Sequence, residues 1–395
     1  MIHSRLPGVH RLSMQERRQR IAEVALLPEL QMHEVCMHGG LSLDAASRMV
    51  ENAIGLFSLP MSVSPNMRVD GTDVLVPMVV EEPSVVAAVG QAALWVREGQ
   101  GALGFCTEAM PAHTYAQLLF AEVPERDRAI NALCSHEAEL LARANAAVPN
   151  LVRRGGGVRR LRVRALGHPC AQGLALDLTL DCVDAMGANL ANTVSEALRA
   201  RVSELVGASA RLAILSNLAD ERLVTSVARV AVGILDSESC VGQEVASRVA
   251  EASRLAEADV YRAVTHNKGI MNGVGAVAIA TGNDWRALEA GAHGYASLGA
   301  GYKPLATWRV EGGELVGRLC MPMAVGTVGG VTAVHDGVKL ALAMLGKPSA
   351  RRLASVMASV GLASNLAALV ALTTVGIQAG HMRLHARKSE ASASQ

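Results

Sequence analysis

Aromatic residues are scarce in this sequence, at 3% of 395 residues, whereas hydrophobic residues make up 50%. The interior must therefore be built from Ala, Val and Leu, which suits helices packed closely against a sheet. A chain of this length can bury a large core and is expected to hold two domains. The formal net charge of +1 provides no long-range field that would attract nucleic acid or anionic lipid.

Paired cysteines are also missing. The chain has seven cysteines, an odd number, and none of them forms a CxxC motif. This pattern predicts neither a zinc site nor a full disulfide framework, and reduced thiols in a cytoplasmic enzyme are the simpler interpretation. The N-terminus lacks the apolar run of a signal peptide. We therefore expect a cytoplasmic protein that needs no metal.

Charged residues are absent between Arg352 and Arg383, a stretch long enough to raise the question of a membrane span. Polar residues such as Ser355 and Asn365 interrupt it, and Gly361 falls where a helix would end. The pattern predicts two buried helices and no membrane span.

The middle third of the sequence has a distinct pattern of predicted strands and helices. Strand and helix patterns alternate in the order β-α-β-β-α-β, which is the ferredoxin-like arrangement. Leu174, Leu176, Leu178 and Leu180 would face the helices, and the opposite face, rich in arginine, would be open, with Asp177 and Asp181 across the strand pair. The expected strands are 115–123, 158–166, 174–183 and 211–215, and the expected helices are 126–146 and 187–206.

The flanking parts predict a larger, helix-rich domain. The expected strands are 73–80 and 223–233; the expected helices are 18–30, 42–57, one opening at 81–84, 242–258 and one beginning at Asp284; and 265–273 is expected to be a Gly- and Asn-rich loop. Because the chain leaves this unit and re-enters it, we predict an α+β fold with an inserted domain. The expected division is a large domain of 1–110 and 221–375, an inserted ferredoxin-like domain of 111–220, and a short C-terminal flap of 376–395.

Four polar positions are candidates for chemistry, and each has an ordinary alternative. Glu82, at a strand-to-helix junction, could be a helix N-terminal acid. Lys268 could be a solvated loop lysine or a charge that stabilises an oxyanion. Asp284 could be a helix cap. His381 and His385 share a helix face, but no HExxH motif or third metal ligand accompanies them.

The turn at 184–189 joins a strand to a helix, so its backbone N–H groups could bind a phosphate. Residues 273–278 match GxGxxA formally, but no strand precedes them, and the chain has no P-loop or GxSxG motif. The arginines of 153–164 suit a solvated sheet face or a cofactor phosphate better than nucleic acid.

Read together and in order, eight segments resemble the signature segments of 3-hydroxy-3-methylglutaryl-coenzyme A (HMG-CoA) reductases, most closely the soluble bacterial class II enzymes. The resemblance runs in register from about residue 4 to 387. The segments are ENAIG at 51–55, VEEPSVVAA at 80–88, DAMGAN at 184–189, LSNLAD at 215–220, THNKGIMNG at 265–273, ATGNDWRA at 280–287, MPMAVGTVGG at 321–330 and GHMRLHAR at 380–387.

The resemblance implies roles for individual residues. It implies a large domain that binds HMG-CoA and a ferredoxin-like domain that binds the dinucleotide. The catalytic positions would be Glu82, Lys268, Asp284 and His381; the substrate-binding positions Ser84, Arg262, Asn272 and Asn217; and the dinucleotide-loop positions Asp184, Met186, Gly187 and Asn189.

The implied reaction reduces the thioester of HMG-CoA to mevalonate and free coenzyme A with two hydrides, or runs in reverse. Lys268 would stabilise the carbonyl oxygen as it becomes negative, with Asp284 keeping it charged and aimed. Glu82 would exchange the proton on that oxygen, and His381 would protonate the departing thiolate. The resemblance also implies homodimers with active sites at the subunit interface, assembling further into a hexamer as a trimer of dimers.

Two departures from the family pattern bear on these expectations. Members that prefer NAD carry an acid shortly before the triple glycine, where this chain has Val148 followed by Arg153 and Arg154. NAD(H) is still favoured, with NADP(H) as the alternative. The chain also ends soon after residue 387, so the flap is expected to be short. Two alternative functions stay open: a coenzyme A thioester enzyme without redox activity, and a binding homologue that has lost turnover.

Overall fold

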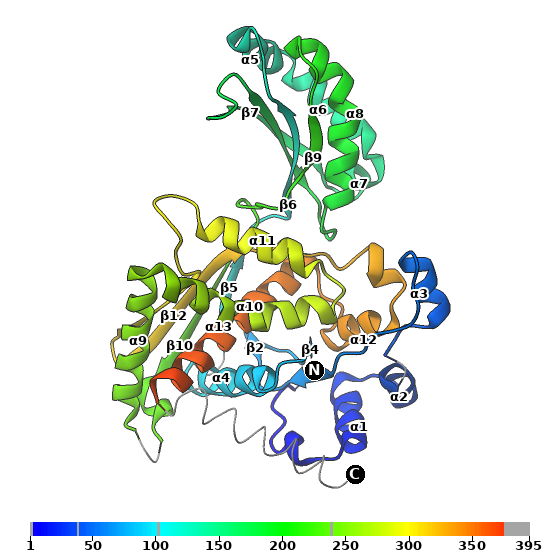
Figure 1. Ribbon diagram of the computed structural model, residues 1–395. Coiled ribbons are helices and arrows are strands. Elements are labelled where there is room, and N and C mark those ends of the chain that lie inside the picture. The colour runs from blue at the N-terminus through cyan, green and yellow to red at the C-terminus, as the bar shows by residue number, and fades with distance from the viewer. Residues whose placement is uncertain (1–2, 38, 101–102, 238–239, 375–395) are drawn as a thin grey trace.

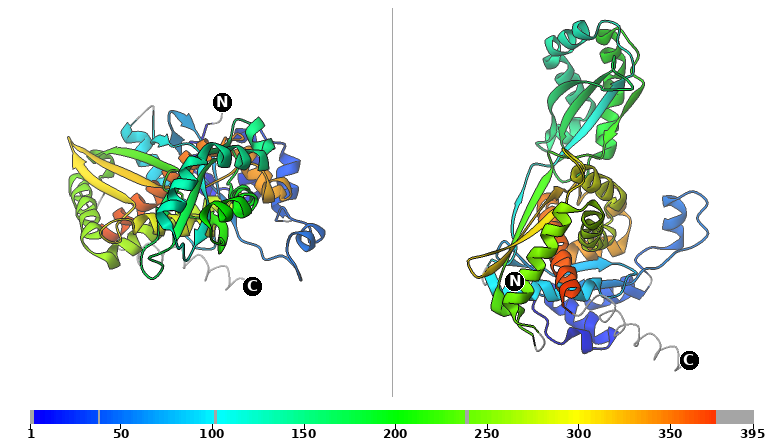
Figure 2. Two further views of the ribbon diagram at one scale, coloured as in Figure 1. Left: turned by 90° about the horizontal axis from the view of Figure 1, so that it is seen from above. Right: turned by 60° about the vertical axis from the view of Figure 1, so that its left-hand side comes forward.

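The computed structural model describes residues 3–37, 39–100, 103–237 and 240–374. Two bodies of unequal size are joined by a narrow connection, with residues 113–216 forming the small upper body in Figure 1. The chain passes into the small body after β5 and returns to the large body at β10, two strands that pair with each other. The views in Figure 2 confirm that the small body projects from the large one.

The small body is a four-stranded antiparallel sheet covered on one face by helices. Its strand order is β7-β8-β6-β9, which is the ferredoxin-like order that the β-α-β-β-α-β pattern predicts. The Leu positions of β8 are fully buried against the helices. The strands are β6 (His113–Phe120), β7 (Gly157–Ala165), β8 (Leu174–Asp181) and β9 (Leu212–Ser216); the helices are α5 (Arg126–Ser135), α6 (Glu137–Ala147), α7 (Pro149–Arg153) and α8 (Ala188–Val206).

The opposite face of this sheet carries the predicted pairing of arginines with aspartates. Asp177 is 1% exposed and accepts hydrogen bonds from Gln117 and Arg164. Arg162 adds a contact of 3.2 Å, and Arg159 lies 3.3 Å from Asp181. Burial opposes ionisation of Asp177, but the hydrogen bonds from Arg164 and Gln117 outweigh it, so its pKa lies below the usual value.

The large body is built around a second antiparallel sheet, of order β11-β12-β10-β5. Helices α4, α9, α10 and α13 bury its apolar side chains in one continuous core. Buried Trp308 donates from its indole nitrogen to Asn365 at 2.8 Å, which ties β11 to α13. The elements are β5 (Cys106–Ala109), β10 (Leu223–Ala231), β11 (Ala306–Glu311), β12 (Glu314–Pro322), α4 (Val85–Gln100), α9 (Gly242–Ala258), α10 (Val260–Ala280), α11 (Trp285–Ala296), α12 (Asp336–Met344) and α13 (Ala350–Thr373).

The predicted loop at 265–273 is wrong, because these residues lie inside α10. One of their glycines, Gly273, serves the packing of α10 against α13. A Cβ on Gly273 would lie 3.0 Å from Ser364 and Val360 of α13, and Gly361 of α13 comes equally close to Val274 and Ile270 of α10. The prediction that a helix ends at Gly361 is also wrong, because α13 runs through this residue without a break.

Helix α13 is long and apolar enough to cross a membrane by length and composition alone. However, 67% of its most apolar window is buried inside the protein. Ser359 and Asn365 find partners there, because Ser359 contacts Ser226 of the sheet and Asn365 accepts from Trp308. Within the residues that the structure describes, α13 is therefore a core helix of the large body.

Several of the predicted helix boundaries are wrong. The helix expected over 126–146 is two helices that meet at His136, and the helix expected to open at 81–84 begins at Val85, after Ser84 with φ of 75°. The helix expected at 18–30 begins earlier, at Met14, and ends at Ala25, and the helix expected at 42–57 runs only from Leu43 to Met49. The observed elements are α1 (Met14–Ala25), α2 (Glu29–Met37), α3 (Leu43–Met49), β1 (Met61–Ser64), β2 (Arg68–Val69), β3 (Thr72–Asp73) and β4 (Val76–Val79).

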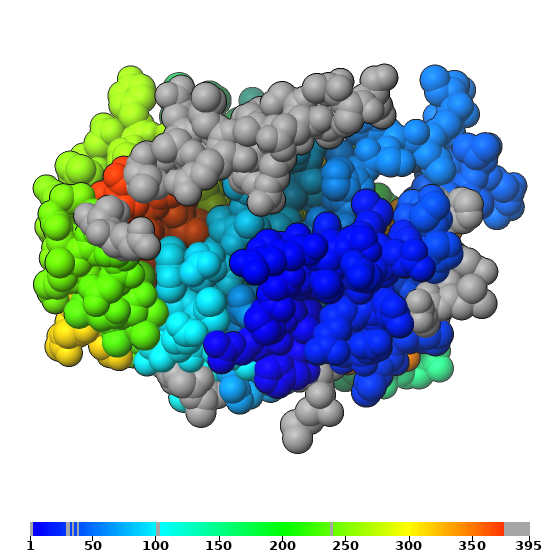
Figure 3. All heavy atoms as spheres, turned by 90° about the horizontal axis from the view of Figure 1, so that it is seen from below, coloured from blue at the N-terminus to red at the C-terminus, as the bar shows by residue number. Residues whose placement is uncertain are grey.

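The N-terminal helices pack against the large body from below, beside α4 (Figure 3). Arg5 reaches Glu98 of α4 at 3.5 Å. Helix α3 and the residues after it project away from the body as an arm (Figure 2). On this arm, which we define as residues 43–58, the side chains of Ile54 and Phe57 are almost fully exposed.

Candidate active site

The Lys268 ammonium nitrogen lies 3.0 Å from a Glu82 carboxylate oxygen. Glu82 follows β4, and Lys268 projects from the first half of α10, which packs against β4. Both side chains face solvent, with exposures of 36% and 60%. A surface ion pair of this kind contributes little to stability, so folding alone does not explain it.

Two more predicted site residues, Ser84 and Asn272, lie near this ion pair, whereas Arg262 lies farther along α10. Ser84 lies two residues after Glu82, and Asn272 lies one helical turn after Lys268 on the same face of α10. Arg262 lies near the start of α10, on the side of His266. Burial, and then the charge of Arg262, lower the pKa of His266 to about 4, so His266 stays neutral in the core.

Asp284 caps α11, the ordinary role that its position allowed. One carboxylate oxygen accepts from the backbone N–H groups of Arg286 and Ala287, each at 3.1 Å. The side chain is 38% exposed and lies 3.4 Å from the Arg286 guanidinium. The second oxygen is free for another partner in the part of the chain that the structure describes.

The second half of α10 separates Lys268 from Asp284. Lys268 lies in the first half of α10, whereas Asp284 follows its end at Ala280. At a rise of about 1.5 Å per residue, the helix from Lys268 to Ala280 is about 18 Å long. One protomer therefore presents these two side chains in separate places.

The turn at 184–187 lies at the junction of the two bodies. An Asp184 carboxylate oxygen accepts from the backbone of Ala350 at the start of α13, and its carbonyl accepts from Thr327. Gly187, with φ of 110°, precedes α8, whose N-terminus has no side-chain cap. Asn189 is exposed in the first turn. The free N–H groups at such a helix start suit an anion.

Asp284 lies near the 184–187 turn through its neighbour Asn283, and Asn217 lies against α11, the helix that Asp284 caps. Asn283 accepts a hydrogen bond of 2.7 Å from the backbone of Gly326. Gly326 packs so closely that a Cβ on it would lie 2.5 Å from the Met186 nitrogen. The carbonyl of exposed Asn217 packs on α11, 2.8 Å from where a Gly291 Cβ would lie. The predicted residues thus form two groups, one around Lys268 and one around Asp284 and the turn.

Arg222 is a residue at this junction that sequence reasoning missed. It is 4% exposed and donates to the carbonyls of Met186, Ala185 and Val325. Burial lowers its pKa to about 10, so it remains a cation at neutral pH. A charged residue directly before a buried strand was the one available signal, and it is a weak one.

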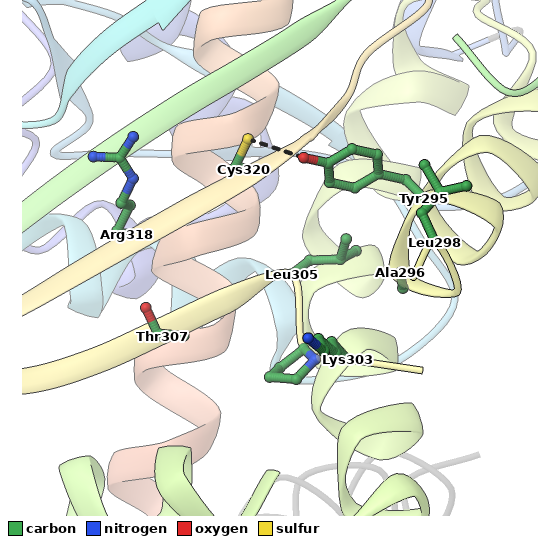
Figure 4. A pocket seen from close by; sticks show the side chains of 9 residues that line it. Tyr295, Ala296, Leu298, Lys303, Leu305, Thr307, Arg318 and Cys320 are labelled. Carbon is green, nitrogen blue, oxygen red and sulfur yellow. Dashed lines mark hydrogen bonds between the residues drawn. The ribbon is translucent and has the colours of Figure 1, made fainter. Parts of the chain in front are cut away.

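A cavity of about 380 Å³ lies between the end of α11 and strands β11 and β12. Figure 4 shows the Tyr295 hydroxyl directed at the Cys320 thiol inside it, a contact of 3.7 Å. Burial, and then this contact, raise the pKa of Tyr295 to about 12. None of the predicted site residues that the structure describes lines the cavity. His381, the fourth predicted catalytic residue, lies outside the described residues.

Comparison with protein families gives one match over nearly the whole chain. The model of a family described as hydroxymethylglutaryl-coenzyme A reductase matches residues 13–386. The 3-hydroxy-3-methylglutaryl-coenzyme A reductase of Archaeoglobus fulgidus is 44% identical over 385 residues, covering 97% of this chain and 86% of the relative. A protein of Borreliella burgdorferi named as a probable enzyme of this type is 34% identical over 361 residues, covering 87% and 78%.

Solved structures agree with this match. A class II 3-hydroxy-3-methylglutaryl-CoA reductase from Streptococcus pneumoniae, bound to NADPH in open conformations, superimposes with a TM-score of 0.89 at 41% identity. The superposition covers 93% of this chain and 99% of that one. Another structure of the S. pneumoniae enzyme has a TM-score of 0.90 at 42% identity, covering 97% and 90%. The likeness therefore extends over both bodies of the fold.

Proposed function

This chain belongs to the hydroxymethylglutaryl-coenzyme A reductase family, and we propose that Glu82 and Lys268 of one protomer meet Asp284 of another in its catalytic centre. As a member of this family, it is an NAD(P)-dependent oxidoreductase that interconverts HMG-CoA with mevalonate and coenzyme A. The contact of 3.0 Å between Lys268 and Glu82 is the observation that carries this proposal. It brings a cation and a proton-exchanging acid together on an exposed surface.

Lys268 supplies the positive charge that the reaction needs. The bound nicotinamide delivers or accepts hydride at the substrate carbonyl carbon, and reduction leaves negative charge on the carbonyl oxygen. An ammonium group held beside that oxygen lowers the barrier by electrostatic stabilisation. The helix α10 fixes the backbone of Lys268, so the charge is oriented before substrate binds.

Glu82 serves as the proton carrier of the pair. Its carboxylate lies within hydrogen-bonding distance of Lys268, so both groups reach one carbonyl oxygen. A protonated Glu82 donates to that oxygen when it becomes negative, and the ionised form takes the proton back in the reverse direction. Ser84 and Asn272, beside the pair, hold the substrate, and the Arg262 guanidinium suits its free carboxylate. Asn217 lines the pocket from the other side.

Asp284 reaches Lys268 from a second copy of the chain. About 18 Å of α10 separates the two residues within one protomer. In a two-fold dimer, Lys268 of each protomer meets Asp284 of the other, which gives two equivalent sites. The exposed Ile54 and Phe57 of the arm supply an apolar contact for such a dimer. We further propose that dimers assemble into a hexamer and that His381, in the C-terminal flap of 376–395, protonates the departing thiolate.

The turn around Met186 and Gly187 is proposed to hold the cofactor phosphates, within an inserted dinucleotide-binding domain of 111–220. The left-handed Gly187, the uncapped start of α8 and exposed Asn189 fit an anionic group. Asp184 anchors the turn to α13 and so fixes its orientation. The substrate-binding domain comprises 1–110 and 221–375.

The chain uses a nicotinamide dinucleotide, and we propose NAD(H) as the favoured form, with NADP(H) as the alternative. The choice depends on the group that meets the ribose 2′ position. Val148 is buried and offers no carboxylate there, and Arg153 and Arg154 are exposed nearby. The S. pneumoniae relative is described with NADPH bound. We also propose that the enzyme is cytoplasmic, that it needs no metal, and that it binds neither a membrane nor nucleic acid.

A spectrophotometric assay tests the catalytic assignment. The oxidation of NADH or NADPH is followed with HMG-CoA, and the reverse reaction with mevalonate, coenzyme A and the oxidised cofactor. Lys268→Ala should lower kcat about 10²- to 10³-fold with its fold intact. Lys339→Ala, which removes a similar exposed ion pair with Asp336 on α12, should leave kcat unchanged. A Lys268→Ala enzyme with a near-normal rate would disprove the assignment.

A further inference from the structure

Arg222 is a buried cation whose hydrogen bonds reach no carboxylate in the described part of the chain, although the charges of Asp181 and Asp184 act on it. It sits between β9 and β10, where the chain returns from the small body to the large one. Among the described residues, its hydrogen-bond acceptors are all main-chain carbonyls, of Ala185, Met186 and Val325. Burying a cation in this way costs free energy, and carbonyl dipoles compensate only part of the lost hydration.

The three carbonyls belong to two different segments. Ala185 and Met186 lie in the turn between β8 and α8, whereas Val325 lies in the loop after β12. Arg222 therefore ties the turn of the small body to a loop of the large body. A planar guanidinium with five donors can span three acceptors at once, which a lysine ammonium on its flexible stem does not match.

These contacts set the direction of the N–H groups in the turn. In a trans peptide, the carbonyl of one residue and the N–H of the next point in opposite directions. Because Arg222 holds the carbonyls of Ala185 and Met186, the N–H groups of Met186 and Gly187 point away from the guanidinium. Neither N–H has an acceptor among the residues that the structure describes.

We infer that Arg222 is a positioning residue for the cofactor pyrophosphate. It orients the N–H donors of the 184–187 turn and places a positive charge behind them. Arg222 does not touch the cofactor. The N–H groups of Met186 and Gly187, together with the start of α8, make the direct contacts. The inference rests on the proposed function of this turn and extends it to a residue outside the turn.

The charge of Arg222 and its geometry make separable contributions. Arg222→Lys keeps the charge but cannot hold three carbonyls in the same arrangement. Arg222→Met removes the charge and leaves the carbonyls without a donor. The dissociation constants of NADH and NADPH should therefore rise at least tenfold in Arg222→Lys and further in Arg222→Met.

Binding titrations by nicotinamide fluorescence measure this effect without turnover. Steady-state kinetics should show a higher KM for the dinucleotide, with the KM for HMG-CoA and kcat at saturating dinucleotide within about threefold of the wild type. Arg199→Met is the matched control, because Arg199 also donates to a main-chain carbonyl of the small body, that of Ala210 at 2.8 Å. This control should leave dinucleotide binding unchanged.

The outcomes separate this inference from the proposed function. If Asn189→Ala and Gly187→Ala weaken dinucleotide binding but both Arg222 variants bind normally, the inference is wrong and the loop assignment stands. If none of these variants weakens binding, the loop assignment fails and the inference fails with it. Equal rises in both KM values, or loss of cooperative thermal unfolding in both Arg222 variants, would make Arg222 a general structural residue and overturn the inference.

Discussion

The ammonium nitrogen of Lys268 lies 3.0 Å from Glu82, although 186 residues separate the two in the chain. Neither side chain is buried. Asp284, the third member of the proposed set, lies beyond the far end of the same helix. We propose that the two groups are halves of a site that a second protomer completes.

Gly187 provides a test of the proposed cofactor-binding turn, residues 184–187. Its φ of 110° disfavours any side chain, and a Cβ would lie 2.5 Å from the Cys182 sulfur. Gly187→Ala should shift the turn and raise the dinucleotide dissociation constant at least tenfold, as measured by fluorescence titration. Gly207→Ala, at the other end of α8 with φ of 72° and open space around it, should lower the free energy of unfolding by about 1 kcal/mol without changing cofactor affinity.

Asp177 predicts how stability depends on pH. Although burial opposes its ionisation, hydrogen bonds from Arg164 and Gln117 keep its pKa below the usual value. A carboxylate with a lowered folded-state pKa stabilises the protein above its unfolded pKa of about 4, and this contribution is lost as pH falls through the folded value. Asp177→Asn should therefore reduce stability at pH 7 by about 1–3 kcal/mol and flatten the acid dependence.

Urea unfolding of the wild type and of Asp177→Asn between pH 3 and 7 measures this effect. The matched control is Asp44→Asn, which removes an exposed pair with Arg48 on α3 and should change stability by less than about 0.5 kcal/mol. Equal acid dependence in the wild type and Asp177→Asn would show that Asp177 is not the titrating group.

The arm of residues 43–58 makes a prediction about assembly. Ile54 and Phe57 expose apolar side chains on a segment that projects from the body (Figure 2). An interface that covers them should be sensitive to charge, so Ile54→Asp should shift the protein toward monomer in sedimentation experiments and lower activity in parallel. Leu255→Asp, on the exposed face of α9, should have no such effect. An Ile54→Asp protein with unchanged mass would contradict a role for the arm in the dimer.

Cofactor choice can be tested at Arg153. NADPH carries a 2′-phosphate that NADH lacks, and exposed Arg153 lies just before the glycines that lead into β7. We expect wild-type kcat/KM to be higher with NADH. Arg153→Ala should lower kcat/KM for NADPH about fivefold or more and leave that for NADH unchanged. Equal losses with both cofactors would mean that Arg153 does not meet the 2′ position.

The small body could be predicted from the sequence almost completely. Alternation along β7 and β8 places Leu176 and Leu178 toward the helices and Arg162 and Asp177 on the other face, and the structure confirms this arrangement. Such sheets follow the period-2 pattern because one face is apolar and the other polar. The strand order then follows from the connections.

Helix α10 could not be predicted, because its glycines have a tertiary cause. Gly269 and Gly273 read as loop residues, yet Gly273 allows α13 to pack closely, and Ser364 donates to the Gly269 carbonyl at 2.8 Å. Glycine lowers helix propensity, but packing between buried helices overrides that preference. The contact between Lys268 and Glu82 was equally hidden, since no local spacing joins them. The resemblance to a family brought these two residues together before the structure did.

Mixed dimers test the shared site most directly. Lys268→Ala and Asp284→Ala, each inactive alone, are expressed together with two different tags, and the heterodimer is purified and assayed for reductase activity. If Lys268 of one chain meets Asp284 of the other, each heterodimer has one intact site, and its activity should recover to about half that of the wild type. The pair Lys268→Ala with Glu82→Gln is the control and should remain inactive, because those two residues come from the same chain. Recovery in the first pair alone is the predicted result, and an inactive Lys268→Ala/Asp284→Ala heterodimer would contradict the account.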